Sequence, residues 1–211
     1  HAAQNRDLDA DIESSYAALL SYFDYLGEID LVKVEPTVKA LERAVAHEPR
    51  NALLAGALAG MNLAQHSRDH KPEAVQRARQ AVRQALAVEP NNPQASTILV
   101  AIQLVSGSLD AARAALERLV PIVWHHPTLL FLAGVCYSVL GDRERCLELT
   151  RRSMRLNPNH PGYRYLFVAI EEYRCDNLEE ALNAAEHLRS PGWGWAPAIR
   201  AAARYNRLRR V

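Results

Sequence analysis

The sequence predicts an all-α protein, an α-α superhelix of about five helix pairs followed by a C-terminal capping helix. Pro93, Pro127 and Pro161 recur at intervals of 34 residues, and Gly107 and Gly141 are separated by the same interval. Proline suits the first turn of a helix, where its missing N–H has no partner, and glycine accepts the positive φ of a tight turn. The 34-residue unit is therefore a helix pair, and such pairs must stack because one pair cannot bury its apolar face alone.

The repeats are expected in chain order at about 9–50, 51–92, 93–126, 127–161 and 162–195, with the capping helix at 196–210. The second repeat is longer because the insertion "HSRDHK" places Pro49 and Pro90 41 residues apart, and the fifth has one extra residue in "NHPG". The phrase "SPGWGWAP" (190–197) occupies the next repeat boundary, where its tryptophans are expected to cover the apolar end of the stack. We expect residues 1–211 to form a single domain of a longer polypeptide.

Composition indicates a folded chain without a strong charge bias. Of its 211 residues 49% are hydrophobic and 23% charged, and the net charge is +1, so no overall field attracts nucleic acid or an anionic membrane. The longest apolar stretches span about 12 residues against the roughly 20 that a membrane span needs. Cys136, Cys146 and Cys175 are an odd number without metal-site spacing, which favours buried thiols in a reducing, cytoplasmic compartment.

The spacing resembles the tetratricopeptide repeat. In that family small residues at positions 8 and 20 lie where the two helices cross, and position 32 is proline. With Pro127 as position 1, these places hold Gly134, Cys146 and Pro158. The second and fifth repeats fit through Ala59 with Ala78 and Ala169 with Ala181. The resemblance covers nearly the whole chain and implies a module that binds proteins.

The C-terminal part resembles, more narrowly, the repeat regions of bacterial regulatory proteins. In that group a tetratricopeptide region follows a nucleotide cyclase domain or a winged-helix DNA-binding domain, and a proline-and-aromatic phrase precedes a helix with Ala-Ala-Ala. The matching residues are Pro191, Gly192, Trp195, Ala201, Ala202, Ala203, Leu208 and Arg209. This resemblance implies a regulatory or docking module of a bacterial signalling protein.

The family resemblance also implies where a partner binds: the concave face formed by the first helix of each pair (helix A). Mapping the family's positions 2, 5, 9, 12 and 13 gives the candidate partner-binding residues Thr97, Ala101, Leu104, Phe131, Val135, Ser138, Tyr163, Leu166, Ile170, Tyr173 and Arg174. The same mapping adds Gln94, Val105, Thr128 and Val139. The strip is mostly apolar, which favours a protein or peptide segment, or a second copy of the chain, as the partner. Packing within the superhelix is the alternative reading.

Other partners and activities are less well supported by the residues. Chaperone-binding relatives hold a peptide carboxylate with Lys and Asn at positions 5 and 9, but here these are Gly56 with Gly60 and Phe131 with Val135. Nucleic-acid binding would depend on the arginines of the capping helix alone. Small-molecule sensing by the groove or by the widened second repeat remains the alternative function.

Nothing in the sequence points to catalysis. No glycine-rich phosphate loop, nucleophile elbow, paired-cysteine motif or HExxH occurs, so we expect no enzymatic activity, no cofactor and no metal site. His66 and His70 lie four residues apart but are expected to be solvated loop residues. His126 in "WHHP" is expected to cap a helix, and carboxylates such as Glu171 and Glu172 are expected to face solvent.

Overall fold

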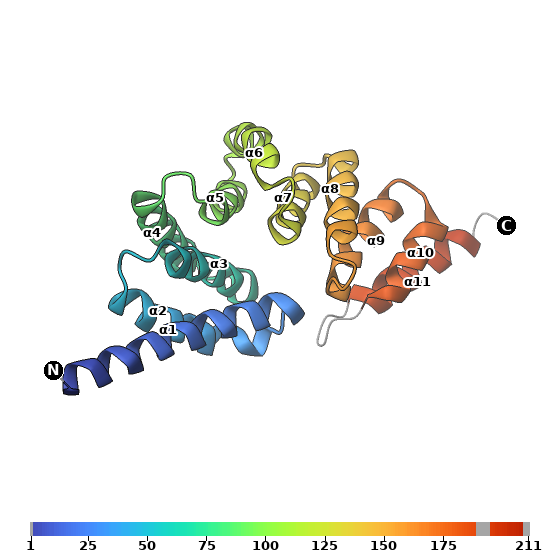
Figure 1. Ribbon diagram of the computed structural model, residues 1–211. Coiled ribbons are helices and arrows are strands. Elements are labelled where there is room, and N and C mark those ends of the chain that lie inside the picture. Colours follow the sequence, from blue (N-terminus) through green and yellow to red (C-terminus); the bar gives the residue numbers. More distant parts are fainter. Residues whose placement is uncertain (1, 189–194, 209–211) are drawn as a thin grey trace. The chain divides into compact units, whose positions relative to one another are not determined.

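The computed structural model describes the backbone of residues 2–188 and 195–208 and the side chains of residues 14–188 and 197–206. Over these residues the chain forms eleven α-helices and two short 3-10 helices (Figure 1). The helices divide into two compact units: unit 1 ends at Ser106 and unit 2 begins at Gly107. No helix within the described ranges is long and apolar enough to span a bilayer.

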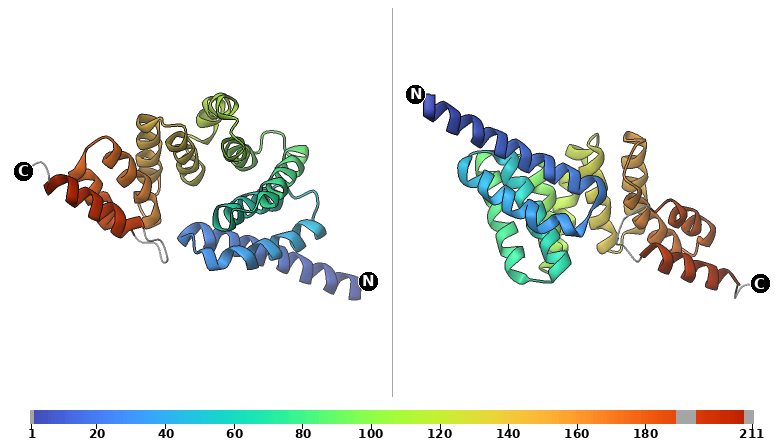
Figure 2. Two further views of the ribbon diagram at one scale, coloured as in Figure 1. Left: turned by 180° about the vertical axis from the view of Figure 1, so that it is seen from behind. Right: turned by 90° about the horizontal axis from the view of Figure 1, so that it is seen from below.

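Unit 1 contains the first two helix pairs and the first helix of the third. Its elements are α1 (Ala2–Glu28), η1 (Leu31–Lys33), α2 (Val34–His47), α3 (Ala52–Asp69), α4 (Pro72–Val88) and α5 (Pro93–Val105). Each helix packs against the next one, and α5 also contacts α3 (Figure 2). This order of contacts is that of stacked helix pairs.

Unit 2 begins with the second helix of the third pair and continues to the capping helix. Its elements are α6 (Leu109–Val123), α7 (Pro127–Val139), α8 (Arg143–Leu156), η2 (Gly162–Arg164), α9 (Tyr165–Arg174), α10 (Leu178–His187) and α11 (Trp195–Leu208). The closest neighbours are α7 with α8, α9 with α10, and α10 with α11. The helices of the first, second, fourth and fifth predicted pairs pack together, and the predicted final helix packs on α10, while α5 and α6 of the third pair belong to different units.

Two features differ from the expectation or lie beyond the description. The insertion in the second repeat does not form a loop: it extends α3 to Asp69, so His66 is helical and only His70, with φ 55°, lies at the turn. Residues 189–194 of the phrase "SPGWGWAP" and the side chains of Trp195 and Ala196 lie outside the described residues.

The helices begin at capping residues that the sequence places at the repeat boundaries. Asn51 accepts hydrogen bonds from the N–H groups of Leu53 and Leu54 at 3.1 and 3.2 Å, and its own amide donates to Glu48 at 2.9 Å. The side-chain amide of Asn92 donates in the same way to the Glu89 carboxylate, at 2.7 Å. These caps satisfy N–H groups that have no partner within the helix.

At the start of α7 the expected histidine cap is present. His126 Nδ1 accepts from the N–H of Leu129 at 3.3 Å, which confirms the capping role predicted for this residue. An imidazole nitrogen can replace the usual side-chain oxygen because the neutral ring keeps one acceptor nitrogen.

The turn between the two helices of a pair needs a left-handed residue. Gly107 and Gly141 adopt φ of 76° and 78°, as the 34-residue glycine spacing predicts. The turn between α9 and α10 has the same geometry at Asp176, with φ 70°. Aspartate tolerates this region better than most residues, since its short polar side chain can form local hydrogen bonds.

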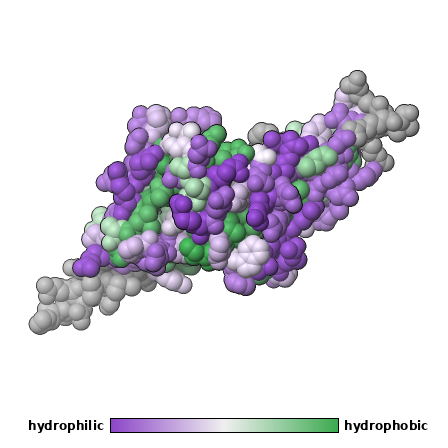
Figure 3. All heavy atoms as spheres, turned by 90° about the horizontal axis from the view of Figure 1, so that it is seen from above, coloured by the Kyte–Doolittle hydropathy of each residue, from purple (hydrophilic) through white to green (hydrophobic). Residues whose placement is uncertain are grey.

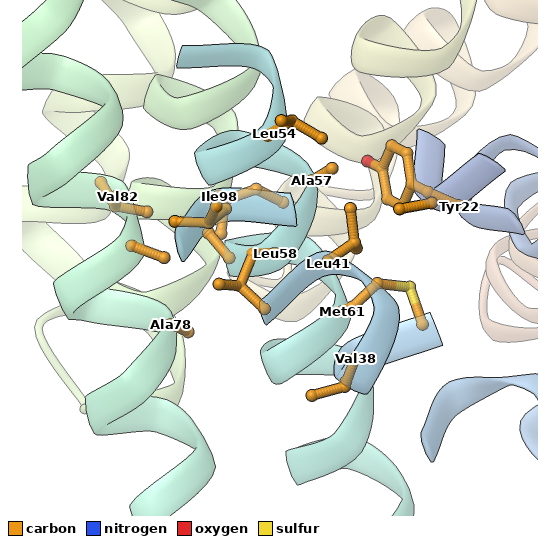
Figure 4. Close-up of a cluster of buried hydrophobic side chains, with 14 of the residues drawn as sticks. Tyr22, Val38, Leu41, Leu54, Ala57, Leu58, Met61, Ala78, Val82 and Ile98 are labelled. Atoms are coloured by element: carbon orange, nitrogen blue, oxygen red, sulfur yellow. The ribbon is translucent and has the colours of Figure 1, made fainter. Parts of the chain in front are cut away.

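Small residues lie where paired helices cross. Ala59, Ala78, Ala169 and Ala181 are fully buried. Gly134 of α7 approaches α8 so closely that an added Cβ would lie 2.9 Å from Thr150 Oγ1. In unit 1, side chains from α1 to α5 form one continuous core, and Figure 4 shows members such as Tyr22, Leu58 and Val82 pointing into it.

Candidate functional site

The helix A strip of unit 2 lies on α7, η2 and α9, and its members differ greatly in exposure. Val139 is 62% exposed at the end of α7. Val135 and Ile170 are half-buried, as is Tyr173, and Arg174 is exposed at the end of α9. These five residues present side-chain surface to solvent, and four of them are apolar or aromatic.

Four other predicted residues of this strip are buried: Phe131, Ser138, Tyr163 and Leu166. The Phe131 ring meets Tyr163 edge-on at a centroid distance of 5.5 Å, and the Arg164 guanidinium lies 5.4 Å from its centre. These residues hold η2 and α9 against α7. Their side chains contact neighbouring helices, so a partner could reach them only if these helices moved apart.

Arg164 is a buried cation whose contacts come from helix ends. It is 1% exposed, and its Nη1 donates to the carbonyl oxygen of Ser153 at 3.2 Å, in the last turn of α8. A cation is favourable at this end of a helix because the unpaired carbonyls there carry partial negative charge. Burial lowers the pKa of the Arg164 guanidinium from its usual value.

Two carboxylates expected to face solvent are buried instead. Glu171 is fully buried and Glu172 is 3% exposed, so the prediction for both was wrong. Glu171 accepts hydrogen bonds from the Ser138 hydroxyl and from Arg174 Nη1, the latter at 3.1 Å. Glu172 accepts from Arg151 and from Asn177 Nδ2, the latter at 2.7 Å. Through these contacts the fourth helix pair is joined to the fifth.

The position of Glu171 therefore explains two predicted site residues. Ser138 and Arg174 both direct a donor toward its carboxylate, and Arg143 Nη1 donates to the Arg174 carbonyl at 2.9 Å. Glu171 could not be recognised as a buried residue from the sequence, because adjacent glutamates near a helix end resemble an ordinary solvated surface. Helical periodicity could have placed one of the pair on the inner face, but it could not have named the donors.

Tyr173 connects the strip to the capping helix. Its hydroxyl accepts a hydrogen bond from Asn206 Nδ2 on α11 at 2.7 Å. Arg200 of α11 donates to the carbonyl of Ala185 on α10 at 3.1 Å, while Arg204 is exposed. The capping helix is thus attached to α9 and α10 by polar contacts as well as by packing.

In unit 1 the predicted strip residues of α5 are largely covered. Thr97 is buried and its hydroxyl donates to the carbonyl of Pro93 at 2.7 Å. Ala101 and Leu104 are half-buried, and Val105 is 48% exposed.

Side chains of unit 1 itself fill the space over the glycines of α3. An added Cβ would lie 3.5 Å from Gln94 at Gly56 and 3.4 Å from the Tyr22 hydroxyl at Gly60. Gln94 Nε2 donates to that hydroxyl at 3.0 Å, joining α5 to α1 across 72 residues of sequence. The glycines thus provide room for two side chains of the same chain.

The buried thiols lie in the helix-crossing region of unit 2. Burial raises the pKa of Cys136 to about 12 and that of Cys146 to about 11, so both stay protonated at neutral pH. Cys175 is exposed. Among the described residues no group of three or more His, Cys, Asp or Glu side chains is arranged to hold a metal ion.

Comparison with known families identifies the repeat. Residues 71–123 match a family model described as tetratricopeptide repeat, and residues 105–188 match one described as anaphase-promoting complex, cyclosome, subunit 3. None of the curated proteins matches the chain.

Solved structures extend the similarity to nearly the whole chain. A thermophilic tetratricopeptide protein of Thermus thermophilus aligns with a TM-score of 0.70 at 16% identity, covering 92% of this chain and 99% of that one. PilF of Pseudomonas aeruginosa aligns with a TM-score of 0.55 at 17% identity, covering 95% and 91%. A tetratricopeptide protein of Parabacteroides merdae aligns with a TM-score of 0.51 at 19% identity, covering 92% and 73%.

These similarities confirm the all-α superhelical fold class, and residues 71–123 resemble a tetratricopeptide repeat. Stacked repeats of this kind form a superhelix whose curvature creates an extended concave surface.

Proposed function

We propose that this chain is a protein-interaction module that binds a protein segment, or a second copy of itself, through the helix A strip, in the setting of a bacterial regulatory protein. The observation that carries the proposal is the exposed apolar end of the strip in unit 2. There Val139 is 62% exposed, beside the half-buried Val135 and Ile170. An exposed group of apolar side chains at helical spacing is suited to the apolar face of a helix or of an extended segment.

The surroundings of this strip favour an apolar partner over an acidic terminus. The family's carboxylate clamp needs Lys and Asn, and the corresponding α7 positions hold Phe131 and Val135. In the view from above in Figure 3, hydrophobic residues form patches among hydrophilic ones. Of the five strip residues of unit 2 that reach solvent, Arg174 is the charged one, and an apolar surface with a polar border is typical of protein interfaces.

The experiment uses one exposed substitution in the strip and one outside it. A displayed library of random peptides is selected on the whole chain, and the affinity of the recovered peptides is measured by fluorescence anisotropy. Val139→Glu should weaken binding about tenfold or more, because it places a charge in an apolar contact. Ile122→Glu on α6, where the side chain is 66% exposed, is the matched control and should leave affinity unchanged.

Oligomeric state distinguishes the two partners. If the strip binds a second copy, sedimentation of the unmodified chain should show a concentration-dependent dimer that Val139→Glu dissociates and Ile122→Glu does not. Peptide binding and sedimentation that are both insensitive to Val139→Glu would refute the proposal for this strip. The regulatory setting has its own test, which is whether the complete open reading frame encodes a cyclase or winged-helix domain.

A further inference from the structure

A cleft away from the helix A strip opens between the end of α6, the last turn of α7 and the first half of α8. Its cavity volume is about 560 Å³, within the range of small-ligand and peptide-side-chain sites. Apolar atoms of Val120, Pro121 and Leu149 form part of its lining, together with the rings of Trp124 and Tyr137. Leu149 and Tyr137 are buried, so they form its base.

Hydrogen-bond acceptors are concentrated on the α6 side of the cleft. Pro121 lies inside α6 and has no N–H, so the backbone carbonyl of Glu117, four residues earlier, lacks its usual helical donor. The Glu117 carboxylate is exposed at the same place. Glu117 thus combines a carbonyl that lacks its helical donor with an exposed side chain, and the residue lines the cavity.

Two arginines near the cleft are paired with carboxylates of the chain itself. Arg145 Nη1 pairs with Glu148 at 2.9 Å, and Arg113 Nη1 pairs with Asp142 at 3.6 Å. Within the described part of the chain no basic nitrogen lies within ion-pairing distance of the Glu117 carboxylate. Glu117 is therefore the acidic residue of the cleft lining, and its carboxylate is free of ion pairs within the described residues.

The aromatic lining is suited to a planar cation. The guanidinium of Arg152 lies 4.0 Å from the centre of the Trp124 ring, and its Nε donates to the Trp124 carbonyl at 3.2 Å. The chain itself therefore pairs an arginine with a ring and a backbone carbonyl at the border of this cleft. An arginine offers five donors in one plane and stacks on aromatic faces, whereas lysine offers a compact point charge.

We propose that this cleft binds an arginine side chain of a partner peptide. The guanidinium donates to the carboxylate and carbonyl of Glu117, and it stacks on the aromatic lining formed with Tyr137. Apolar residues beside the arginine in the peptide contact Val120, Pro121 and Leu149. This site is separate from the helix A strip and does not depend on the function proposed for that strip.

The test compares two peptides of equal shape. Acetyl-Ala-Leu-Arg-Leu-Ala-amide and the same peptide with citrulline, which is neutral, are titrated to millimolar concentration into the isotopically labelled whole chain and followed by amide NMR. The arginine peptide should shift signals from the end of α6, from around Tyr137 and from the first turns of α8. The citrulline peptide should bind at least about tenfold more weakly, because it lacks the charge-assisted bonds to the carboxylate.

Two exposed glutamates provide the matched variants. Glu117→Gln should weaken binding of the arginine peptide about tenfold, whereas Glu144→Gln should leave it unchanged. Glu144 lies in the first turn of α8, outside the cleft. Val139→Glu should leave this binding intact, which separates failure of this site from failure of the helix A strip. Equal binding of the two peptides, shifts mapped elsewhere, an unaffected Glu117→Gln variant or no binding would each overturn the proposal.

Discussion

Gly134→Ala provides the sharpest test of the close helix crossing in unit 2. An added Cβ would lie 2.9 Å from Thr150 Oγ1 and 3.3 Å from the backbone carbonyl oxygen of Cys146. Because the second of these atoms belongs to the α8 backbone, the clash cannot be relieved by rotating a side chain alone. Overpacking of this kind costs about 1–3 kcal/mol, whereas replacing a helical glycine by alanine gains about 1 kcal/mol.

The expected net effect is a loss of up to about 2 kcal/mol in the free energy of unfolding. Gly60→Ala in α3 is the matched control, since its added Cβ would meet only side-chain atoms, the nearest being the Tyr22 hydroxyl at 3.4 Å. That variant should be stabilised by up to about 1 kcal/mol, because only the gain in helix propensity applies.

Urea unfolding followed by circular dichroism measures both free energies. Thr150→Ala removes the nearer of the two clashing atoms, so the double variant Gly134→Ala/Thr150→Ala should recover part of the loss. The coupling free energy between these sites is expected to be about 0.5–2 kcal/mol. A Gly134→Ala protein as stable as the unmodified chain, or no coupling with Thr150, would show that the helices are not in such close contact.

Four further predictions concern buried polar groups, helix capping and thiols. Glu171→Ala should lower the free energy of unfolding by about 1–3 kcal/mol in urea titrations, because it leaves the buried Ser138 hydroxyl without its acceptor; an unchanged midpoint would contradict this. Asn92→Ala should cost about 1 kcal/mol through loss of the α5 cap, measured by thermal unfolding against Asn92→Ser, which keeps a capping oxygen. Iodoacetamide should modify Cys175 well before Cys136 and Cys146, as mass spectrometry of peptides would show, and early labelling of either buried thiol would contradict their burial. Burial raises the pKa of the two buried thiols above that of an unfolded thiol. Their contribution to the free energy of unfolding is therefore retained below pH ~8.5 and falls as pH rises toward ~11. A double Cys→Ala variant should show a flatter decline.

Much of the fold could be predicted because it depends on local rules. The 34-residue spacing of Pro93 and Pro127 identifies helix starts, and Gly107 and Gly141 identify turns, since the conformational limits of proline and glycine act within one or two residues. The small residues at helix crossings follow from the same repeat. The position of the insertion in the second repeat was predicted correctly. The insertion was predicted to form a loop, but its residues up to Asp69 continue α3.

The candidate site was less predictable because burial depends on neighbours that are distant in sequence. Repeat positions identify the strip, but they do not show that Phe131 is covered by Tyr163, or that Gln94 fills the space over Gly56 and Tyr22 the space over Gly60. These contacts join residues 32 or more positions apart, so no local pattern contains them.

The sequence by itself determined the repeat, the helix boundaries and the small residues at the helix crossings, because each depends on backbone geometry that one residue type permits and others do not. The tertiary structure alone decided which strip residues remain exposed, where Glu171 finds its donors, and that Glu117 lines a cleft together with Pro121. Solvent exposure and charge balance are properties of packed surfaces, and a surface forms only after helices far apart in the chain have come together.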